Sequence, residues 1–97
     1  MTWWLHPDAA LEHEAQVAWY EARQTGLGRS YHNAFLSAVA MIVADPTRFK
    51  VVHKADIRKL RLRGFPFDLI YRQAGLAVQI LAVAHHRRRP GHWTDRR

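Results

Sequence analysis

The sequence contains no cysteine among its 97 residues. This excludes disulfides, thiol nucleophiles and thiolate metal sites, and it is typical of a reducing compartment such as the cytoplasm. The longest apolar run, residues 34–44, is too short to cross a bilayer and is interrupted by Ser37. Residues 1–5 have no basic start, so no secretion signal is expected. We therefore expect a cytoplasmic protein without membrane association.

Acidic residues are scarce, with 8 Asp and Glu against 15 Lys and Arg, and the net charge is +7. Residues 1–45 hold two basic and five acidic side chains, a balance of −3, whereas residues 46–97 hold thirteen and three, a balance of +10. Such a basic second half favours binding to polyanions or to an acidic protein, although it is also compatible with a merely soluble cationic surface. Apolar residues make up 48% of the chain. Length and composition predict one globular domain, residues 1–97.

Two helices are expected in the first half. Pro7 and Asp8 suit the first turn of a helix, and Gly26 can end it in the left-handed conformation. A second helix begins near Gly28 and ends at residues 45–46, because a residue before proline is disfavoured in a helix. Apolar residues at helical spacing predict the buried faces. They are Leu11, Ala15, Ala18, Trp19 and Ala22 in the first helix, and Leu27, Tyr31, Ala34, Phe35, Ala38 and Ile42 in the second.

The second half reads as extended structure. Residues 48–53, 57–63, 65–72 and 76–84 are predicted strands, and residues 2–5 form a further short one. The short link between the helices predicts an antiparallel hairpin. We therefore predict an α+β fold in which an N-terminal helical hairpin packs on a small antiparallel β-sheet, in the order β-α-α-β-β-β.

A basic strand is the first candidate binding feature. Lys59, Arg61 and Arg63 alternate with Leu60 and Leu62, so the cations share one face at a spacing of ~7 Å, from a rise of ~3.3 Å per residue. Such a row can follow a nucleic-acid backbone, or it can be an ordinary solvated strand face.

The second candidate feature is the segment that follows the last strand. His85 can transfer protons near neutral pH, and Arg88 can bind phosphate and stabilise negative charge. Together with Arg61, these groups suit RNA cleavage by a neighbouring 2′-hydroxyl, which needs proton transfer and cations near the phosphorus. We predict His85, Arg61 and Arg88 as catalytic residues, while a structural role for His85 stays open.

Other cations in the second half complete a predicted nucleic-acid-binding surface. Neither a metal nor a cofactor is expected, because His85 and His86 are adjacent on a strand and point oppositely. Trp93 can either stack on a base or cover the sheet. The predicted binding residues are Lys54, Arg58, Lys59, Arg63, Arg72, Arg87, Arg89, His92 and Trp93.

An ordered set of motifs covers nearly the whole chain and resembles the RelE/ParE toxin superfamily, in the group of plasmid stabilisation proteins. Relatives often have tyrosine at the position of His92. The motifs are Trp3, His6-Pro7, Trp19-Tyr20-Glu21, Gly26-Leu27-Gly28, Phe35, Asp45-Pro46, Ile57-Arg58 with Leu62, Phe65-Pro66-Phe67, Ile70-Tyr71-Arg72, and Ala82-Val83-Ala84-His85 with Arg88, Pro90 and Trp93.

The resemblance implies the toxin of a type II toxin–antitoxin system, neutralised by a small acidic antitoxin in a hetero-oligomer, with a homodimer also conceivable. RelE-like members cleave mRNA on the ribosome, and ParE-like members inhibit DNA gyrase. We predict a metal-independent, ribosome-dependent endoribonuclease that acts on mRNA. The alternatives are a non-enzymatic gyrase inhibitor and an inactive paralogue that only binds the antitoxin.

Overall fold

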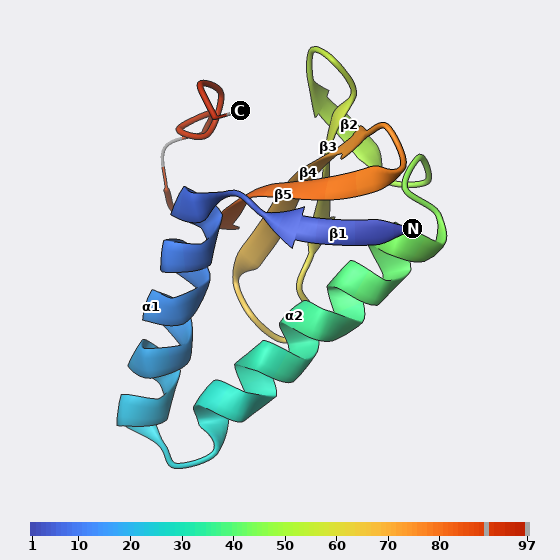
Figure 1. The fold of residues 1–97 in the computed structure, drawn as a ribbon. Coiled ribbons are helices and arrows are strands. Elements are labelled where there is room, and N and C mark those ends of the chain that lie inside the picture. Colours follow the sequence, from blue (N-terminus) through green and yellow to red (C-terminus); the bar gives the residue numbers. More distant parts are fainter. Residues whose placement is uncertain (89, 97) are drawn as a thin grey trace.

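A computed structural model describes residues 1–88 and 90–96. Figure 1 shows both helices on the same side of a five-stranded sheet. We call this side the inner face of the sheet and the opposite side the outer face. The elements in chain order are β1 (Thr2–Leu5), α1 (Pro7–Arg23), α2 (Leu27–Ala44), β2 (Lys50–His53), β3 (Ile57–Arg61), β4 (Phe67–Ala74) and β5 (Ala77–His85).

The strands follow the order β1-β5-β4-β3-β2 across the sheet. The strands β2 to β5 pair in an antiparallel manner, which confirms the predicted α+β fold and its element order. The short strand β1 adds a parallel edge, with Thr2 opposite Ala77 and Leu5 opposite Ile80. The two helices form the long crossover that a parallel pair requires. As a result, β5 lies between two strands, in agreement with its apolar sequence.

The turn between the helices depends on two glycines and one carboxylate. Gly26 has φ +88°, the left-handed conformation predicted for it. The Glu21 carboxylate accepts hydrogen bonds from the N–H groups of Gly26, at 3.0 and 3.1 Å, and of Gly28, at 3.1 Å. A Cβ on Gly28 would lie 2.7 Å from the Val17 carbonyl oxygen, so only glycine allows the helices to approach this closely.

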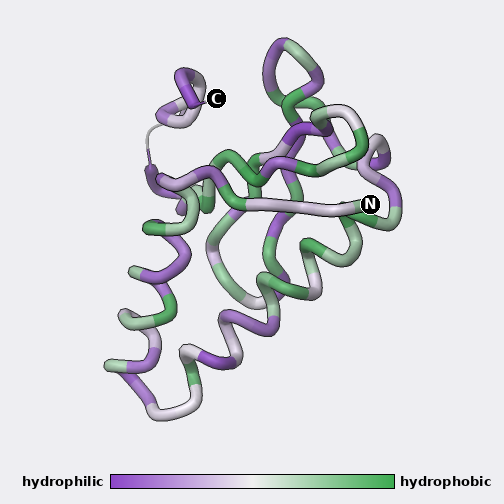
Figure 2. The backbone as a smooth tube through the Cα atoms, in the orientation of Figure 1, coloured by the Kyte–Doolittle hydropathy of each residue, from purple (hydrophilic) through white to green (hydrophobic). Residues whose placement is uncertain are grey.

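The main core lies between α2 and the inner face. Tyr31, Phe35 and Ile42 from α2 pack against Leu69 and Ile80 from the sheet, and each of these five is at most 1% exposed. Figure 2 shows green, hydrophobic stretches recurring along α2 and purple, hydrophilic ones along α1. Among the described residues, no helix combines the length and the apolar character that a membrane span would need.

The predicted buried face of α1 is wrong. Leu11 is 65% exposed and Trp19 is 46% exposed, whereas Ala9 and His13 are buried. Alanines occur on several sides of this helix, so its apolar stripe does not define one orientation. Instead, Trp19 lies under the guanidinium of Arg23, whose Cζ is 3.7 Å from the ring centroid.

Candidate functional site

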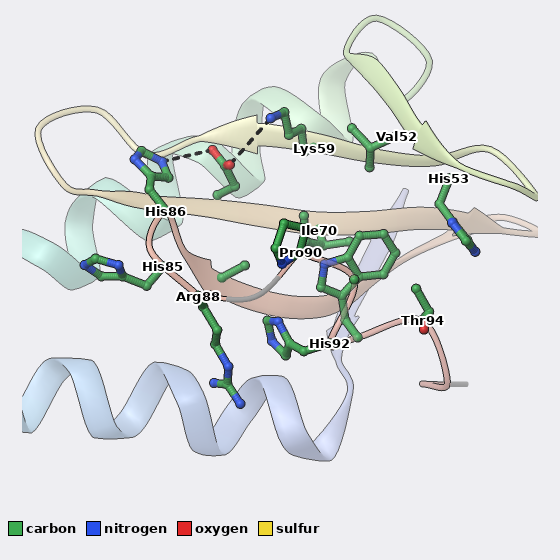
Figure 3. A pocket seen from close by; sticks show the side chains of 14 residues that line it. Val52, His53, Lys59, Ile70, His85, His86, Arg88, Pro90, His92 and Thr94 are labelled. Atoms are coloured by element: carbon green, nitrogen blue, oxygen red, sulfur yellow. Dashed lines mark ion pairs between the residues drawn. The ribbon is translucent and has the colours of Figure 1, made fainter.

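The chain beyond β5 folds back over the outer face of the sheet. There Trp93, only 7% exposed, joins a second apolar cluster with Ile57, Ile70 and Leu81. Trp93 thus packs on the outer face of the sheet. Between the folded-back segment and β2–β4 lies a pocket of about 410 Å³, shown in Figure 3. We call it the outer-face pocket.

Asp68 stands at one wall of the outer-face pocket and faces three basic side chains. Its carboxylate oxygens lie 3.8 Å from Lys59 Nζ, 3.7 Å from Arg61 Nε and 3.4 Å from His86 Nε2. The pairs from Lys59 and His86 are drawn in Figure 3. Because β3 pairs with β4, Arg61 lies directly opposite Asp68 in the register. Three basic side chains thus surround one carboxylate, and two of them, Lys59 and His86, line the pocket with it.

Glu12 of α1 holds the other side of the folded-back segment through a second carboxylate cluster, which we call the Glu12 clasp. Arg96 donates from Nη1 at 2.8 Å and from Nη2 at 2.9 Å, and the backbone N–H of Val83 donates at 3.0 Å. His92 Nε2 lies 3.3 Å and Arg88 Nη1 3.4 Å from Glu12 Oε2. The bidentate Arg96 pair is the strongest of these interactions.

The surroundings of Glu12 favour its charged state. Burial by itself raises the pKa of Glu12, but the hydrogen bonds from Arg96 and Val83 outweigh it, and the pKa is lowered overall. The same hydrogen bond raises the pKa of Arg96. The pair is thus fully ionised at neutral pH and fixes the chain end to α1.

The three residues predicted to be catalytic have different partners in the structure. Arg61 faces Asp68, and Arg88 joins the Glu12 clasp. His85 lies opposite Phe67 in the register, its ring is edge-on to Phe67 at 5.0 Å, and its Nδ1 accepts a hydrogen bond from a backbone N–H. Figure 3 shows the His85 and His86 side chains pointing away from each other.

Two of the predicted nucleic-acid-binding arginines have partners within the fold. Arg58 Nη1 donates to the carbonyl oxygens of Thr47, at 2.8 Å, and Phe49, at 2.7 Å. It therefore secures the segment that leads into β2. Arg72 Nε donates to Gln79 Oε1 at 2.7 Å, across the β4–β5 pair. Both arginines thus have a structural role.

Other predicted binding residues lie on the surface. Lys54, Arg63 and Arg87 are exposed, and Arg63 falls in the turn beyond β3, so that the predicted basic row ends at Arg61. Arg89 lies outside the described residues. In residues 1–88 and 90–96, no group of three or more His, Asp or Glu side chains is placed to hold a metal ion.

Sequence reasoning missed Glu12, Asp68, His86 and Arg96 as site residues. Asp68 had a usable signal, since it lies between Phe67 and Leu69 and so points away from their buried face. The link between Glu12 and Arg96 has no local signal, because the two residues are 84 positions apart.

The chain is similar to known proteins in both fold and sequence. A solved structure described as "Chromosomal ParDE TA system from P. aeruginosa" matches with a TM-score of 0.75 and 20% identity, over 88% of this chain and 95% of that chain. The two chains therefore share a fold. No curated protein sequence matches this one. The family model for the ParE toxin of the type II toxin–antitoxin system parDE matches residues 5–90, so the chain belongs to this family, and its resemblance to the RelE/ParE superfamily is confirmed.

Proposed function

We propose that the chain is a growth-inhibiting toxin, neutralised by a cognate antitoxin in the cytoplasm, and that its target is DNA gyrase. The observation that carries this proposal is the match to the ParE toxin family over residues 5–90. ParE-like members of the superfamily inhibit gyrase without being known as nucleases. The sequence analysis favoured mRNA cleavage over gyrase inhibition, and we now propose the opposite preference.

The arrangement of the arginines supports a non-enzymatic mechanism. Stabilising a phosphorane needs cations that are aimed at the developing charge. Here Arg61 and Arg88 each face a carboxylate of the protein itself, at 3.7 and 3.4 Å. The exposed cations Arg63 and Arg87 remain on the surface and favour contact with an acidic or DNA-bound partner.

Inducible expression in a bacterial host tests the target. We expect DNA synthesis to stop before protein synthesis in pulse labelling, with gyrase-linked double-strand breaks in the chromosome. Co-expression of a cognate antitoxin should restore growth. A drop in protein synthesis that precedes any change in DNA would contradict the gyrase proposal, and normal growth would indicate an inactive paralogue.

Ribosome-dependent mRNA cleavage is the second candidate function. It is favoured by the wall of the outer-face pocket, where Lys59 and His86 offer a cation and a group able to carry a proton next to Asp68. His85, Arg61 and Arg88 stay its predicted catalytic residues. Mapping of mRNA 5′ ends after induction tests it. New ends that vanish in the His85→Ala or Arg88→Ala variant would support it, and intact mRNA during growth arrest would exclude it.

A further inference from the structure

The outer-face pocket has the size of a small-molecule site, and inhibition of gyrase does not require it. Its volume of about 410 Å³ falls in the lower part of the range of about 300–1,000 Å³ typical of such sites. The pocket lies between the sheet and a segment that the Glu12 clasp fixes in place, so its walls are formed in advance.

One wall of the pocket carries basic groups that are loosely paired with a single carboxylate. Lys59 Nζ and His86 Nε2 contact Asp68 at 3.8 and 3.4 Å, longer than the roughly 2.7–2.9 Å of charge-assisted hydrogen bonds. Arg61 is a third basic partner of the same carboxylate, at 3.7 Å. The single carboxylate of Asp68 thus does not satisfy all the hydrogen-bond donors of Lys59 and His86. A phosphate beside these two residues could accept shorter hydrogen bonds.

A further cation lies at the opposite rim. Arg88 is 53% exposed and reaches Glu12 only at 3.4 Å, whereas Arg96 already binds both oxygens of that carboxylate at 2.8 and 2.9 Å. Arg88 can therefore turn toward an anionic ligand without opening the Glu12 clasp. Figure 3 shows its side chain extending from the segment that follows β5.

The remaining wall is apolar and includes an aromatic residue. Val52, Ile70, Pro90 and Trp93 line it, and His53 stands edge-on to the Trp93 ring with centroids 5.6 Å apart. A flat apolar ring can be buried against such a wall, while its charged substituent faces Lys59 and His86. An inorganic anion would leave this wall without a partner.

We propose that the outer-face pocket binds a nucleotide, with its base against the wall of Val52, Ile70 and Trp93 and its phosphate near Lys59 and His86. The chemistry is the same for a free nucleoside monophosphate and for the phosphorylated end of a single strand. The proposal goes beyond the proposed inhibition of gyrase, because it concerns a ligand of the toxin itself.

Calorimetric titration of the full chain with UMP and AMP at low salt tests the proposal. Ribose 5-phosphate and inorganic phosphate serve as probes without a base. We expect the better of the two nucleotides to bind at least about tenfold more tightly than ribose 5-phosphate, a difference of about 1.4 kcal/mol. A 5′-phosphorylated dinucleotide separates the two sources: binding equal to that of the mononucleotide indicates a strand end, and much weaker binding indicates a free nucleotide.

A matched pair of variants locates the site. Lys59→Gln removes a charge from the pocket wall, and Lys50→Gln removes the same charge from the residue opposite it in β2, which is exposed and does not line the pocket. We expect Lys59→Gln to weaken nucleotide binding about tenfold and Lys50→Gln less than twofold.

His86→Gln provides a second variant at the same wall, and a thermal unfolding curve for each variant verifies that it is folded. Equal weakening by Lys50→Gln and Lys59→Gln, or equal binding of ribose 5-phosphate and nucleotides, would overturn the proposal. Because the titration uses purified protein and the target is read from labelling in cells, the nucleotide site and the gyrase target can fail separately.

Discussion

The two faces of the sheet are covered in different ways. The inner face packs against α2 through large side chains such as Tyr31 and Phe35, which are 0% and 1% exposed. The outer face has a smaller cluster around Ile70 and Trp93, an open pocket beside it, and a covering segment fixed by the Glu12 carboxylate. The inner face therefore provides most of the stability of the fold. The outer face combines a small apolar cluster with several basic side chains that share one carboxylate. Both are features of a binding surface.

The largest effect is expected from a substitution at the inner face. Phe35→Ala removes a buried ring and should lower the free energy of unfolding by about 3–5 kcal/mol. This is a large part of the total of about 5–15 kcal/mol typical of a domain. Leu36→Ala, at the neighbouring position that is 41% exposed, is the control and should change it by less than about 1 kcal/mol. Urea unfolding followed by circular dichroism measures both, and equal losses would contradict the comparison.

The second effect concerns the Glu12 clasp. Glu12→Gln removes the main charge that compensates Arg96, whose side chain is 12% exposed, and should cost about 3 kcal/mol, because the largely buried guanidinium keeps only Asp8, at 3.7 Å, as an ionic partner. It should also speed trypsin cleavage after Arg87 and Arg88. Glu14→Gln, on an exposed position of the same helix, is the matched control and should leave both readouts unchanged. If the two variants behaved alike, the segment over the outer face would be held by Trp93 alone.

A smaller effect follows from His13, a histidine of the inner core that has a hydrogen-bond partner at only one of its two ring nitrogens. His13 Nε2 lies 2.9 Å from His32 Nδ1, and its ring packs on Phe35 at 4.0 Å. Burial, with a contribution from His32, lowers the pKa of His13 from 6.5 to about 4. At pH values between about 4 and 6.5, the unfolded chain therefore binds a proton at His13 that the folded chain does not bind. The stability that neutral His13 contributes is present above pH 6.5 and is lost as the pH falls toward 4.

Between pH 7 and pH 5 this linkage should lower the free energy of unfolding by about 2 kcal/mol, at about 1.4 kcal/mol per pKa unit. The lowered pKa of Glu12 acts in the same direction but only at more acidic pH, since the ordinary pKa of a glutamate side chain is 4.5. Urea unfolding at a series of pH values measures the slope. A His13→Phe variant should have a flatter profile over this range, and an unchanged slope would assign the effect to other groups.

The sequence predicted the elements well where one local pattern dominates. The helical stripe of α2 ends at the predicted Asp45-Pro46, and the strand of residues 76–84 corresponds to β5, Ala77–His85. Pro7 and Gly26 mark the start of α1 and the turn after it, as expected. These features depend on backbone preferences and on periodic burial, which neighbouring residues encode.

What could not be predicted depends on contacts between distant segments. The parallel pairing of β1 with β5 brings Trp3 opposite Val78, and nothing near residue 3 specifies that partner. The orientation of α1 was missed because its alanines fit several faces. At the candidate site, alternation predicted that Lys59 and Arg61 share a face, but their partner Asp68 comes from another strand, and the Glu12 partner of Arg88 comes from α1.

The smallest effect compares the two faces with one chemical change. Ile80→Val on the inner face removes a methylene from a side chain that is 0% exposed, and should cost about 1 kcal/mol by leaving a closed cavity. Ile70→Val removes the same group from the neighbouring strand on the outer face, where the side chain is 3% exposed and lines the pocket. The lost volume there only enlarges a space already open to solvent, so we expect about 0.5 kcal/mol. Urea unfolding of both variants measures the two losses of unfolding free energy. Equal losses would mean that the outer face is packed as tightly as the inner one and that the pocket walls are part of the core.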